Sequence, residues 1–386
     1  MTASVLRLKN VARVGGGQSP PSDEVTTFEG EGLPFLQGNA EFGSDHPRPR
    51  NRCDAPPRVA PAGSILMSVR APVGALNWAD RDYGIGRGLC SIVPTKGEAR
   101  YVWWALQAAV PALRSVATGS TFEAVAVEDV AGVFLPAHDE RVQRRITDFL
   151  DYETARIDAL IAVKQRMISA AQARLLATQH WSHQQSTIEG QQIQIRRVFA
   201  RRQDETLPDD PVVTAFRDGQ VTSRNLRRSE GYTVSFTEQG YQRVEVGDLV
   251  FHGLDGFAGA CGVAETAGKC SGVYHVCVPS PDVLSEFSAI QLQVLAQSGF
   301  VALQASSVRE RAVDLRNWER FGTIPIPIPT LETQRDHVAR VASARSFANR
   351  MTTTLATQIE LLRERRQALI TAAGLEVHIG MKHQAA

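Results

Sequence analysis

The chain has 386 residues, of which 43% are hydrophobic and 22% charged, and this length allows two or three domains with cores of their own. It has no run of about 18 apolar residues, no apolar secretory signal and no CxxC pair, so we expect no membrane span, no zinc site and a cytoplasmic location. The formal net charge of +1 argues mildly against nucleic-acid binding, although 37 of the 42 cationic residues are Arg, which suits contacts with phosphate and guanine.

The first segment, residues 1–136, is predicted to be a β-rich domain. Short strand-like runs such as residues 64–69 are bounded by Gly, Pro, Asn and Asp. One short helix is expected around residues 101–115. The order of the strands within the sheet does not follow from these patterns.

A long helix is predicted over residues 137–183. The segment that follows Pro136 is free of internal Pro and Gly, and its apolar positions form a narrow stripe, which is typical of a coiled-coil seam. These positions are Ile146, Leu150, Ile157, Leu160, Met167, Ala171 and Leu175. Some 40 helical residues, at about 1.5 Å each, would make a rod of about 60 Å.

A second β-rich domain is predicted over residues 184–329, beginning at a polar run over residues 184–190. Its strand-like runs include residues 249–251 and 274–278, and a helix is expected around residues 284–297. A second long helix over residues 330–374 and a tail over 375–386 complete the chain. The apolar stripe of this helix comprises Val338, Val341, Ala348, Met351, Leu355, Ile359, Leu362, Leu369 and Ala373.

The two halves are related by an internal repeat. Residues 73–94 align without a gap on residues 258–279, and residues 63–68 align on residues 247–252. The individual identities are weak, but their shared order and nearly constant offset make chance agreement improbable. Each half therefore consists of a β-rich domain followed by one long helix.

The sequence therefore predicts an α+β fold with two β-rich domains in pseudo-twofold tandem repeat. Each long helix must bury its apolar stripe, so we expect the two helices to pair as an antiparallel coiled coil with the domains at opposite ends. The alternative is two unrelated amphipathic helices that each pack on their own domain.

A search for catalytic motifs finds none that is complete. The stretch AGKC at residues 267–270 lacks the first glycine and the Ser or Thr of a phosphate-binding loop. The motifs HExxH and GxSxG are absent, and His46, His252 and His275 do not have the spacing of metal ligands. We expect no cofactor, no metal and no catalytic site in this chain.

Residues that suit DNA contact recur at similar places in both halves. They combine side chains for base edges or phosphates with glycines that let the backbone approach closely. Any one of them, taken alone, is better explained as a turn or solvated surface residue, and it is their recurrence in both halves that favours DNA contact. The candidates in the first half are Gln37, Asn39, Ser68, Arg70, Arg87, Ser120 and Thr121. The candidates in the second half are Arg224, His252, Asp255, Lys269, Tyr274, Ser306, Ser307 and Arg309.

These motifs resemble the specificity subunits of type I restriction-modification enzymes. The stretches ILMSVRAPVG (65–74) and YGIGRGL (83–89) are similar to one version of the family's target-recognition domain, and GYQRVEVGDLVFHGLDGFAG (240–259) is similar to another. The stretches QRRI (143–146) and ERRQALITAA (364–373) resemble its joining helices. The family's usual PLEEQ helix start is altered here to PAHDE (136–140) and PTLETQ (329–334).

The resemblance implies a DNA-recognition subunit without catalytic activity. Each target-recognition domain would read one half of a split site on double-stranded DNA, and the helices would set the spacing. Two DNA-methyltransferase subunits would dock on the helices, and restriction subunits that act as translocases would join the complex. Because the two domains differ strongly in sequence, the expected site is asymmetric and bipartite.

Two other functions remain open on the sequence. A coiled-coil assembly scaffold whose domains bind proteins would account for the nearly neutral charge and the long helices. An enzyme, such as a nuclease, could assemble a site in space from residues that are distant in the chain.

Overall fold

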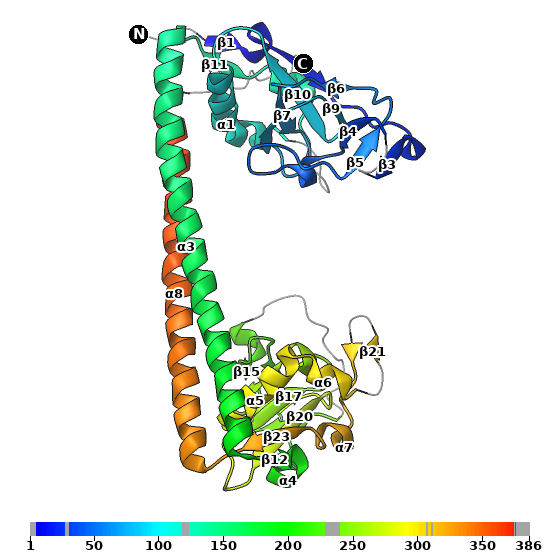
Figure 1. Ribbon diagram of the computed structural model, residues 1–386, viewed down its shortest axis with the longest axis vertical. Coiled ribbons are helices and arrows are strands. Elements are labelled where there is room, and N and C mark those ends of the chain that lie inside the picture. The colour runs from blue at the N-terminus through cyan, green and yellow to red at the C-terminus, as the bar shows by residue number, and fades with distance from the viewer. Residues whose placement is uncertain are drawn as a thin grey trace. The chain divides into compact units, whose positions relative to one another are not determined.

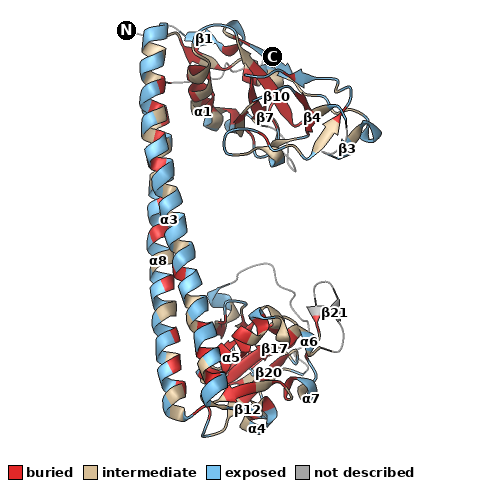
Figure 2. Cartoon of the chain, in the orientation of Figure 1, coloured by how far each residue is buried: buried red, intermediate tan, exposed pale blue. Residues whose placement is uncertain are grey.

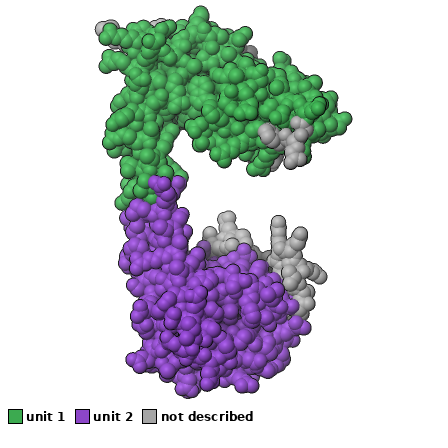
Figure 3. Space-filling model, viewed as in Figure 1, with its two compact units in different colours: residues 1–164, 357–386 green, residues 165–356 purple. Residues whose placement is uncertain are grey.

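The computed structural model describes residues 5–27, 31–117, 123–227, 240–305, 308–309, 312–373 and 375 (Figure 1). The chain divides into two compact units: unit 1 comprises residues 1–164 and 357–386, and unit 2 comprises residues 165–356 (Figure 3). Each unit contains one β-rich segment and a part of both long helices, α3 (Glu140–Glu189) and α8 (Leu331–Ala372). Within the described ranges, no helix combines the length and apolar character needed to cross a membrane.

Unit 1 is built on two sheets. One has the strand order β2-β10-β7-β8, the other has the order β3-β5-β4-β9-β6, and β1 pairs separately with β11. The strands are β1 (Val5–Arg7), β2 (Ala12–Gly16), β3 (Val25–Thr27), β4 (Leu33–Leu36), β5 (Asn51–Cys53), β6 (Val59–Ala60), β7 (Ile65–Ser68), β8 (Leu76–Trp78), β9 (Tyr83–Ile85), β10 (Leu89–Pro94) and β11 (Phe134–Pro136). The helices before α3 are α1 (Ala99–Ser115) and α2 (Val127–Ala131). The main core lies between α1, the first sheet and the long helices.

Unit 2 contains a four-stranded sheet with the order β13-β20-β17-β18, and its described residues also form the two-stranded pairs β12-β23, β14-β15, β16-β19 and β21-β22. Its strands are β12 (Gln191–Gln194), β13 (Phe199–Arg201), β14 (Val213–Ala215), β15 (Val221–Ser223), β16 (Gln242–Val244), β17 (Leu249–His252), β18 (Cys261–Val263), β19 (Gly268–Cys270), β20 (Tyr274–Pro279), β21 (Val308–Arg309), β22 (Ala312–Val313) and β23 (Pro325–Ile328). Its helices, besides α3 and α8, are α4 (Ile195–Val198), α5 (Ser285–Gln297), α6 (Phe300–Leu303) and α7 (Trp318–Phe321). The helix α5 covers the sheet over a core of buried apolar side chains.

The predicted duplication is confirmed in the sheets, which share strand order and register. In unit 1, Ser68 of β7 pairs with Leu89 of β10, and in unit 2, His252 of β17 pairs with Tyr274 of β20. The next strand follows the same rule, because Ile65 pairs with Trp78 where Leu249 pairs with Val263. A slip of one residue would turn every buried side chain of a strand to the other face, so the shared register places equivalent residues on equivalent faces.

A glutamine side chain, half-buried in unit 1 and buried in unit 2, fixes the start of the long helix in each unit. The Gln143 Oε1 atom accepts a hydrogen bond from the Glu98 backbone N–H at 2.9 Å, just before α1. In unit 2, Gln334 Oε1 accepts one from the Leu284 N–H at 2.9 Å, just before α5. These two bonds align α1 with α5 and the start of α3 with the start of α8. The equivalent residues named below follow from this alignment and from the strand register.

The long helices run antiparallel to each other within each unit. In unit 1, Lys164 donates a hydrogen bond to Gln358 at 2.6 Å, and Arg366 reaches back to Asp158 at 3.1 Å. In unit 2, the ring of His337 packs against Trp181 at 4.9 Å. Residue numbers on α8 therefore fall as those on α3 rise, as the predicted antiparallel coiled coil requires. Figure 2 shows buried residues along the facing sides of both helices.

The seam of α3 differs from the predicted stripe at two positions. Leu150, Ile157 and Ala171 are buried as expected, but Leu160 is 50% and Met167 44% exposed. The polar side chains of Thr147, Thr154, Gln179, Ser182 and Ser186 are buried on this helix instead. A pattern based on hydrophobicity passes over polar seam residues and selects the nearest apolar neighbours, which belong to a second stripe.

The helix α3 also continues beyond its predicted end at residue 183. The polar run over residues 184–189 is helical, and the hydroxyls of Ser186 and Thr187 donate to backbone carbonyls one turn earlier, at 2.6 and 2.9 Å. Hydroxyl groups that bond within their own helix do not interrupt it. Helix α3 instead ends at Glu189, and Gly190 follows, where an added Cβ would lie 2.6 Å from the Pro329 nitrogen.

Candidate nucleic-acid interface

The candidates Gln37 and Arg87 lie side by side in unit 1. The Gln37 Nε2 group donates to the hydroxyl of Ser19 at 3.0 Å, and the Arg87 backbone N–H lies 3.4 Å from the same oxygen. Glycines permit this approach, because a Cβ at Gly86 would lie 2.8 Å from the Gln37 side chain and one at Gly88 would lie 2.7 Å from its carbonyl oxygen. Gln37 and Arg87 are exposed and can therefore offer donors to an incoming ligand.

Arg70 joins this group through the backbone. The N–H of Val69 donates to the carbonyl of Gly88 at 3.0 Å, which ties the residue before Arg70 to the residue after Arg87. The Arg70 side chain is exposed, and its backbone forms a β-bridge with Ala124. The two guanidinium groups thus extend from adjacent backbone segments at the end of β7.

Ser68 braces the loop that carries Arg70. It is only 1% exposed, its hydroxyl donates to the Pro72 carbonyl at 2.5 Å, and the same oxygen accepts from the Ala75 N–H at 3.1 Å. Asn39 is half-buried at the start of a short 3-10 helix, Asn39–Glu41. For Ser68, burial in the free chain indicates a structural role, and its contact with DNA stays a prediction.

His252 occupies the position in unit 2 that Ser68 occupies in unit 1. Its Nδ1 atom accepts hydrogen bonds from the N–H groups of Leu254 and Asp255, both at 3.1 Å, and so braces the equivalent loop. Burial lowers the pKa of His252, which keeps the ring neutral at neutral pH. With Nδ1 as the acceptor, the proton lies on Nε2, which can donate to a ligand.

Three further candidates surround His252. The ring of Tyr274 meets that of His252 edge-on at 4.5 Å, and burial raises the pKa of the tyrosine to about 12, so its hydroxyl stays protonated. The Asp255 carboxylate accepts from the exposed Arg217 at 2.8 Å. Arg224 is half-buried, and its Nε group lies 3.3 Å from the hydroxyl of Thr214. The structure thus gathers a cation, a carboxylate, an imidazole and a phenol around the end of β17.

Lys269 is placed differently from these residues. It lies in β19 and is 4% exposed, and its ammonium group donates to the Pro208 carbonyl at 3.1 Å. A buried lysine needs such partners, because an isolated buried charge is strongly unfavourable. Its contact with DNA stays a prediction.

The remaining candidates fall wholly or partly outside the described residues. These are Ser120, Thr121, Ser306 and Ser307. The backbone of Arg309 forms part of β21, but its side chain lies outside the described part of the chain.

Ser19 and Arg217 were not among the residues predicted from sequence patterns. Ser19 precedes two prolines in an irregular segment. The segment is held beside Gln37 because the Gly17 and Gln18 N–H groups bond to the Leu89 and Ile85 carbonyls, both at 2.9 Å. Arg217 is one of many exposed arginines, and only its ion pair with Asp255 distinguishes it. Both depend on contacts between residues that are distant in sequence.

The fold and these surfaces define a class of protein with two related α+β units and a pair of long antiparallel helices. In each unit, polar and charged side chains at the strand ends can form hydrogen bonds with a ligand.

No protein-family model matches the chain. A putative type I restriction enzyme specificity subunit of Methanocaldococcus jannaschii is 38% identical over 152 residues, which is 39% of this chain and 35% of that protein. A putative type I specificity subunit of Mycoplasma pneumoniae is 21% identical over 233 residues, which is 55% of this chain and 60% of that protein.

By sequence, the chain is thus a relative of the specificity subunits of type I restriction enzymes. The chain matches 35% and 60% of the length of these two relatives. A solved structure of the HsdS subunit from Thermoanaerobacter tengcongensis aligns over 97% of this chain and 96% of that chain, with 15% identity and a TM-score of 0.49.

Proposed function

We propose that this chain is the DNA sequence-specificity subunit of a type I restriction-modification complex, and that it reads a bipartite, asymmetric site on double-stranded DNA. The observation that carries the proposal is the duplicated sheet, in which equivalent strand ends carry different side chains. Unit 1 has Ser68 and Arg70 where unit 2 has His252 and Leu254. A shared scaffold with unlike reading residues suits two half-sites of different base sequence.

The exposed side chains of unit 1 and the half-buried side chains of unit 2 around these strand ends suit readout of base edges. In unit 1, Arg70 and Arg87 can donate to guanine, and Gln37 can both donate to and accept from adenine. In unit 2, Asp255 can accept from cytosine, while Arg224 and the Nε2–H of His252 can donate. The buried Ser68, Tyr274 and Lys269 would hold these loops in place.

The chemistry of the complex would belong to its partners. We assign this chain no catalytic role and no cofactor of its own, because two methyltransferase subunits and the restriction subunits that act as translocases would supply methyl transfer, ATP hydrolysis and cleavage. A cytoplasmic location accompanies this role. The five cysteines are free and buried, as in a protein that folds under reducing conditions.

A second apolar stripe on α3 supports docking of the methyltransferase subunits on the helices. Phe149, Tyr152, Leu160 and Val163 are between 42% and 64% exposed. Their spacing of three, eight and three residues places them along one side of the helix, away from the buried seam. An exposed apolar stripe of this kind is typical of an interaction site.

A methylation map tests the proposal directly. We would co-express the chain with its candidate methyltransferase and map methylated adenines across the host genome, expecting one asymmetric motif with two separated halves. A single continuous palindrome would contradict the two-reader proposal. Association with the methyltransferase without sequence-selective methylation would instead favour an assembly scaffold.

Incubation of the purified chain alone with DNA and a divalent metal should give no cleavage, and cleavage would indicate a nuclease.

The helices are also proposed to set the distance between the half-sites. Insertion of one heptad at matched positions of α3 and α8 preserves the seam and adds about 10 Å of helix, which corresponds to about three base pairs. The methylated motif should keep both halves and lengthen its gap by this amount. An unchanged gap in a folded, active complex would refute the spacing role.

A further inference from the structure

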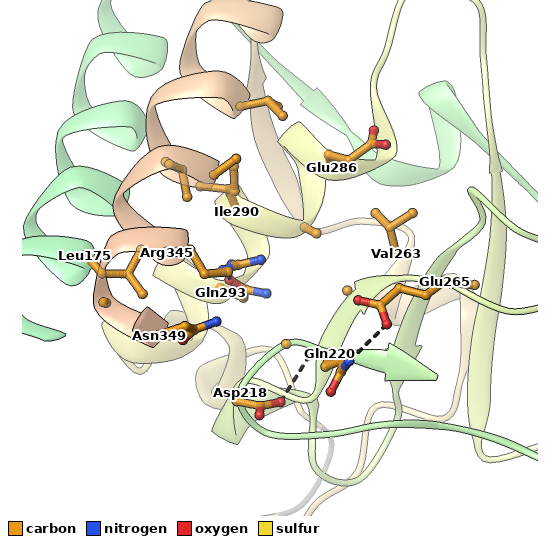
Figure 4. Close-up of a pocket in the computed structure, with 18 of the residues that line it drawn as sticks. Leu175, Asp218, Gln220, Val263, Glu265, Glu286, Ile290, Gln293, Arg345 and Asn349 are labelled. Atoms are coloured by element: carbon orange, nitrogen blue, oxygen red, sulfur yellow. Dashed lines mark hydrogen bonds between the residues drawn. The ribbon is translucent and has the colours of Figure 1, made fainter. Parts of the chain in front are cut away.

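Unit 2 contains a pocket with a volume of about 900 Å³ between β18, α5 and the two long helices (Figure 4). Its walls are apolar at Leu175, Val263, Ala289 and Ile290. Polar side chains converge on it from α5 and α8, with Arg345 at their centre. This volume and this mixture of an apolar wall with a few polar groups are typical of binding sites for small organic ligands.

The equivalent place in unit 1 is occupied by the chain's own tryptophans. Trp78 stacks on Trp103 with ring centroids 5.1 Å apart and an angle of 11° between the planes. The strand register makes Val263 the equivalent of Trp78, and the alignment of α1 with α5 makes Ala289 the equivalent of Trp103. The smaller side chains leave space in unit 2 where two indole rings stack in unit 1.

Unit 2 also lacks a set of hydrogen bonds that links the long helix to the domain helix in unit 1. In unit 1, the Asp151 carboxylate of α3 accepts hydrogen bonds from Arg100 and from the indole Nε1 of Trp104 on α1, both at 2.9 Å. The equivalent residues of unit 2 are Ala342, Glu286 and Ile290, all of which line the pocket. These three side chains cannot form the same hydrogen bonds. In unit 2, α5 and α8 are instead linked through other side chains.

Arg345 takes the position on α8 that Thr154 takes on α3. Its NH2 group donates to Gln293 Oε1 at 3.2 Å, and this oxygen also accepts from Gln179 Nε2 at 2.9 Å. In the described part of the chain, Arg345 has no ion pair. A guanidinium group carries five N–H donors, and most of them are left for a ligand or solvent.

Three carboxylates line the pocket: Glu286 is exposed on α5, and the other two already have partners. Asp218 forms an ion pair with Arg227 at 2.8 Å, and Glu265 accepts from Gln220 Nε2 at 2.9 Å. Burial is the main reason that the pKa of Arg345 is lowered, and the attraction of these two carboxylates only partly offsets it. An anion that entered the pocket would therefore relieve the desolvation of this cation.

We infer that this pocket binds a planar aromatic group that carries a carboxylate. The ring would lie against Val263, Ala289 and Ile290, in the space that indole rings occupy in unit 1. The carboxylate would accept paired hydrogen bonds from Arg345, which is the geometry that guanidinium groups favour. The site does not depend on DNA recognition and is a property of unit 2 alone.

Two probes that differ only in charge test the inference on the purified full-length chain. N-acetyl-tryptophan carries an indole and a carboxylate, whereas N-acetyl-tryptophanamide has the same shape without the charge. Titration calorimetry should give a Kd on the order of 100 µM for the acid. The amide should bind about tenfold more weakly or worse, because a charge-assisted bidentate pair is lost. Equal affinity of the two probes would overturn the inference.

Substitutions test separately the role of the Arg345 guanidinium and that of the open volume beside Ala289. Arg345→Gln should abolish the preference for the acid, and Ala289→Trp, which restores the residue found in unit 1, should block both probes by filling the pocket. Arg350→Gln is the matched control, because Arg350 is exposed on the same helix, bonds to Ser346 at 2.6 Å and lies outside the pocket. Binding that survives Ala289→Trp in a variant with an unchanged melting temperature would also refute the site.

The same chemistry could come from a free aromatic acid or from the C-terminal aromatic residue of a polypeptide. The peptide acetyl-Gly-Gly-Trp with a free terminal carboxylate distinguishes these sources. Tighter binding of the peptide than of N-acetyl-tryptophan would assign the pocket to a polypeptide terminus, and weaker binding would assign it to a free acid. Failure of both, at concentrations where the chain remains folded, would show that no such site exists.

Discussion

In unit 1, the space between α1 and the long helix is filled by stacked tryptophans and a carboxylate tie, whereas in unit 2 the same space is hollow around Arg345. Yet the two units share strand order, strand register and the glutamine that fixes the start of the long helix. The features that they share are backbone pairing and buried bonds to the backbone. Those that differ are side chains at strand ends and at the contact between domain and helix. A duplicated scaffold can thus keep its backbone while its sites diverge.

The largest expected difference concerns packing against the long helix. Leu150 is fully buried in the core of unit 1, and its equivalent in unit 2, Val341, lines the pocket. Leu150→Ala should lower the free energy of unfolding by about 2–5 kcal/mol, since it opens a cavity in a packed core. Val341→Ala should cost less than half of this, because it removes fewer atoms and enlarges an existing hollow. Chemical denaturation measures both, and equal losses would show that the two contacts are packed alike.

The paired glutamines should also differ in their contributions. Gln334 is fully buried and makes three hydrogen bonds, to the Leu284 N–H and to the Asp282 and Pro329 carbonyls. Gln143 is half-buried, and its side chain bonds to Glu98 and His138. Substitution by alanine should cost about 2–3 kcal/mol at Gln334 and about 1 kcal/mol at Gln143. A larger loss at Gln143, measured by thermal unfolding, would contradict this ranking.

Acid should destabilise unit 2 through a histidine that unit 1 lacks. His275 is buried, its Nε2 group donates to the Leu315 carbonyl at 2.7 Å, and burial lowers its pKa from 6.5 to about 4. As the pH falls below 6.5, the unfolded chain takes up a proton that the folded chain refuses until about pH 4, so stability falls in this window. The loss between pH 7 and pH 5 should be about 2 kcal/mol.

The equivalent residue in unit 1 supplies the control for this pH effect. Burial raises the pKa of the Cys90 thiol to about 12, so this residue stays neutral across the same range. The variant His275→Cys should therefore flatten the dependence of stability on pH between 7 and 5. Denaturation curves at the two pH values measure it, and an unchanged slope would assign the acid sensitivity to other groups.

The smallest expected effect tests the reading residues. Arg70→Ala should reduce methylation about tenfold at sites defined by one half of the motif, because one bidentate base contact is lost. Arg81→Ala is the control, since Arg81 is exposed in the same unit and pairs with Asp80 at 2.9 Å. Equal loss on specific and random DNA would make Arg70 a phosphate contact. Loss at both half-sites would refute the assignment of one unit to one half.

Much of the fold could be predicted from the sequence. The strand-like runs at residues 64–69 and 274–278 are observed as β7 and β20, and the helices expected near residues 101–115 and 284–297 are observed as α1 and α5. These predictions hold because strand and helix patterns are local. The predicted seam of α3 was wrong at two of its seven positions, since Leu160 and Met167 lie on an exposed stripe that hydrophobicity alone cannot distinguish from the seam.

The sequence by itself determined the duplication, the two long helices and the candidate polar residues, because each is written in local patterns or in self-similarity. Only the tertiary structure decided that Ser68 and His252 brace equivalent loops, that Lys269 is buried, and that Ser19 and Arg217 join the polar surfaces. It also decided that one unit fills with tryptophan the place that the other leaves open around Arg345. Burial and hydrogen bonding depend on which distant segments meet, and no local pattern records that.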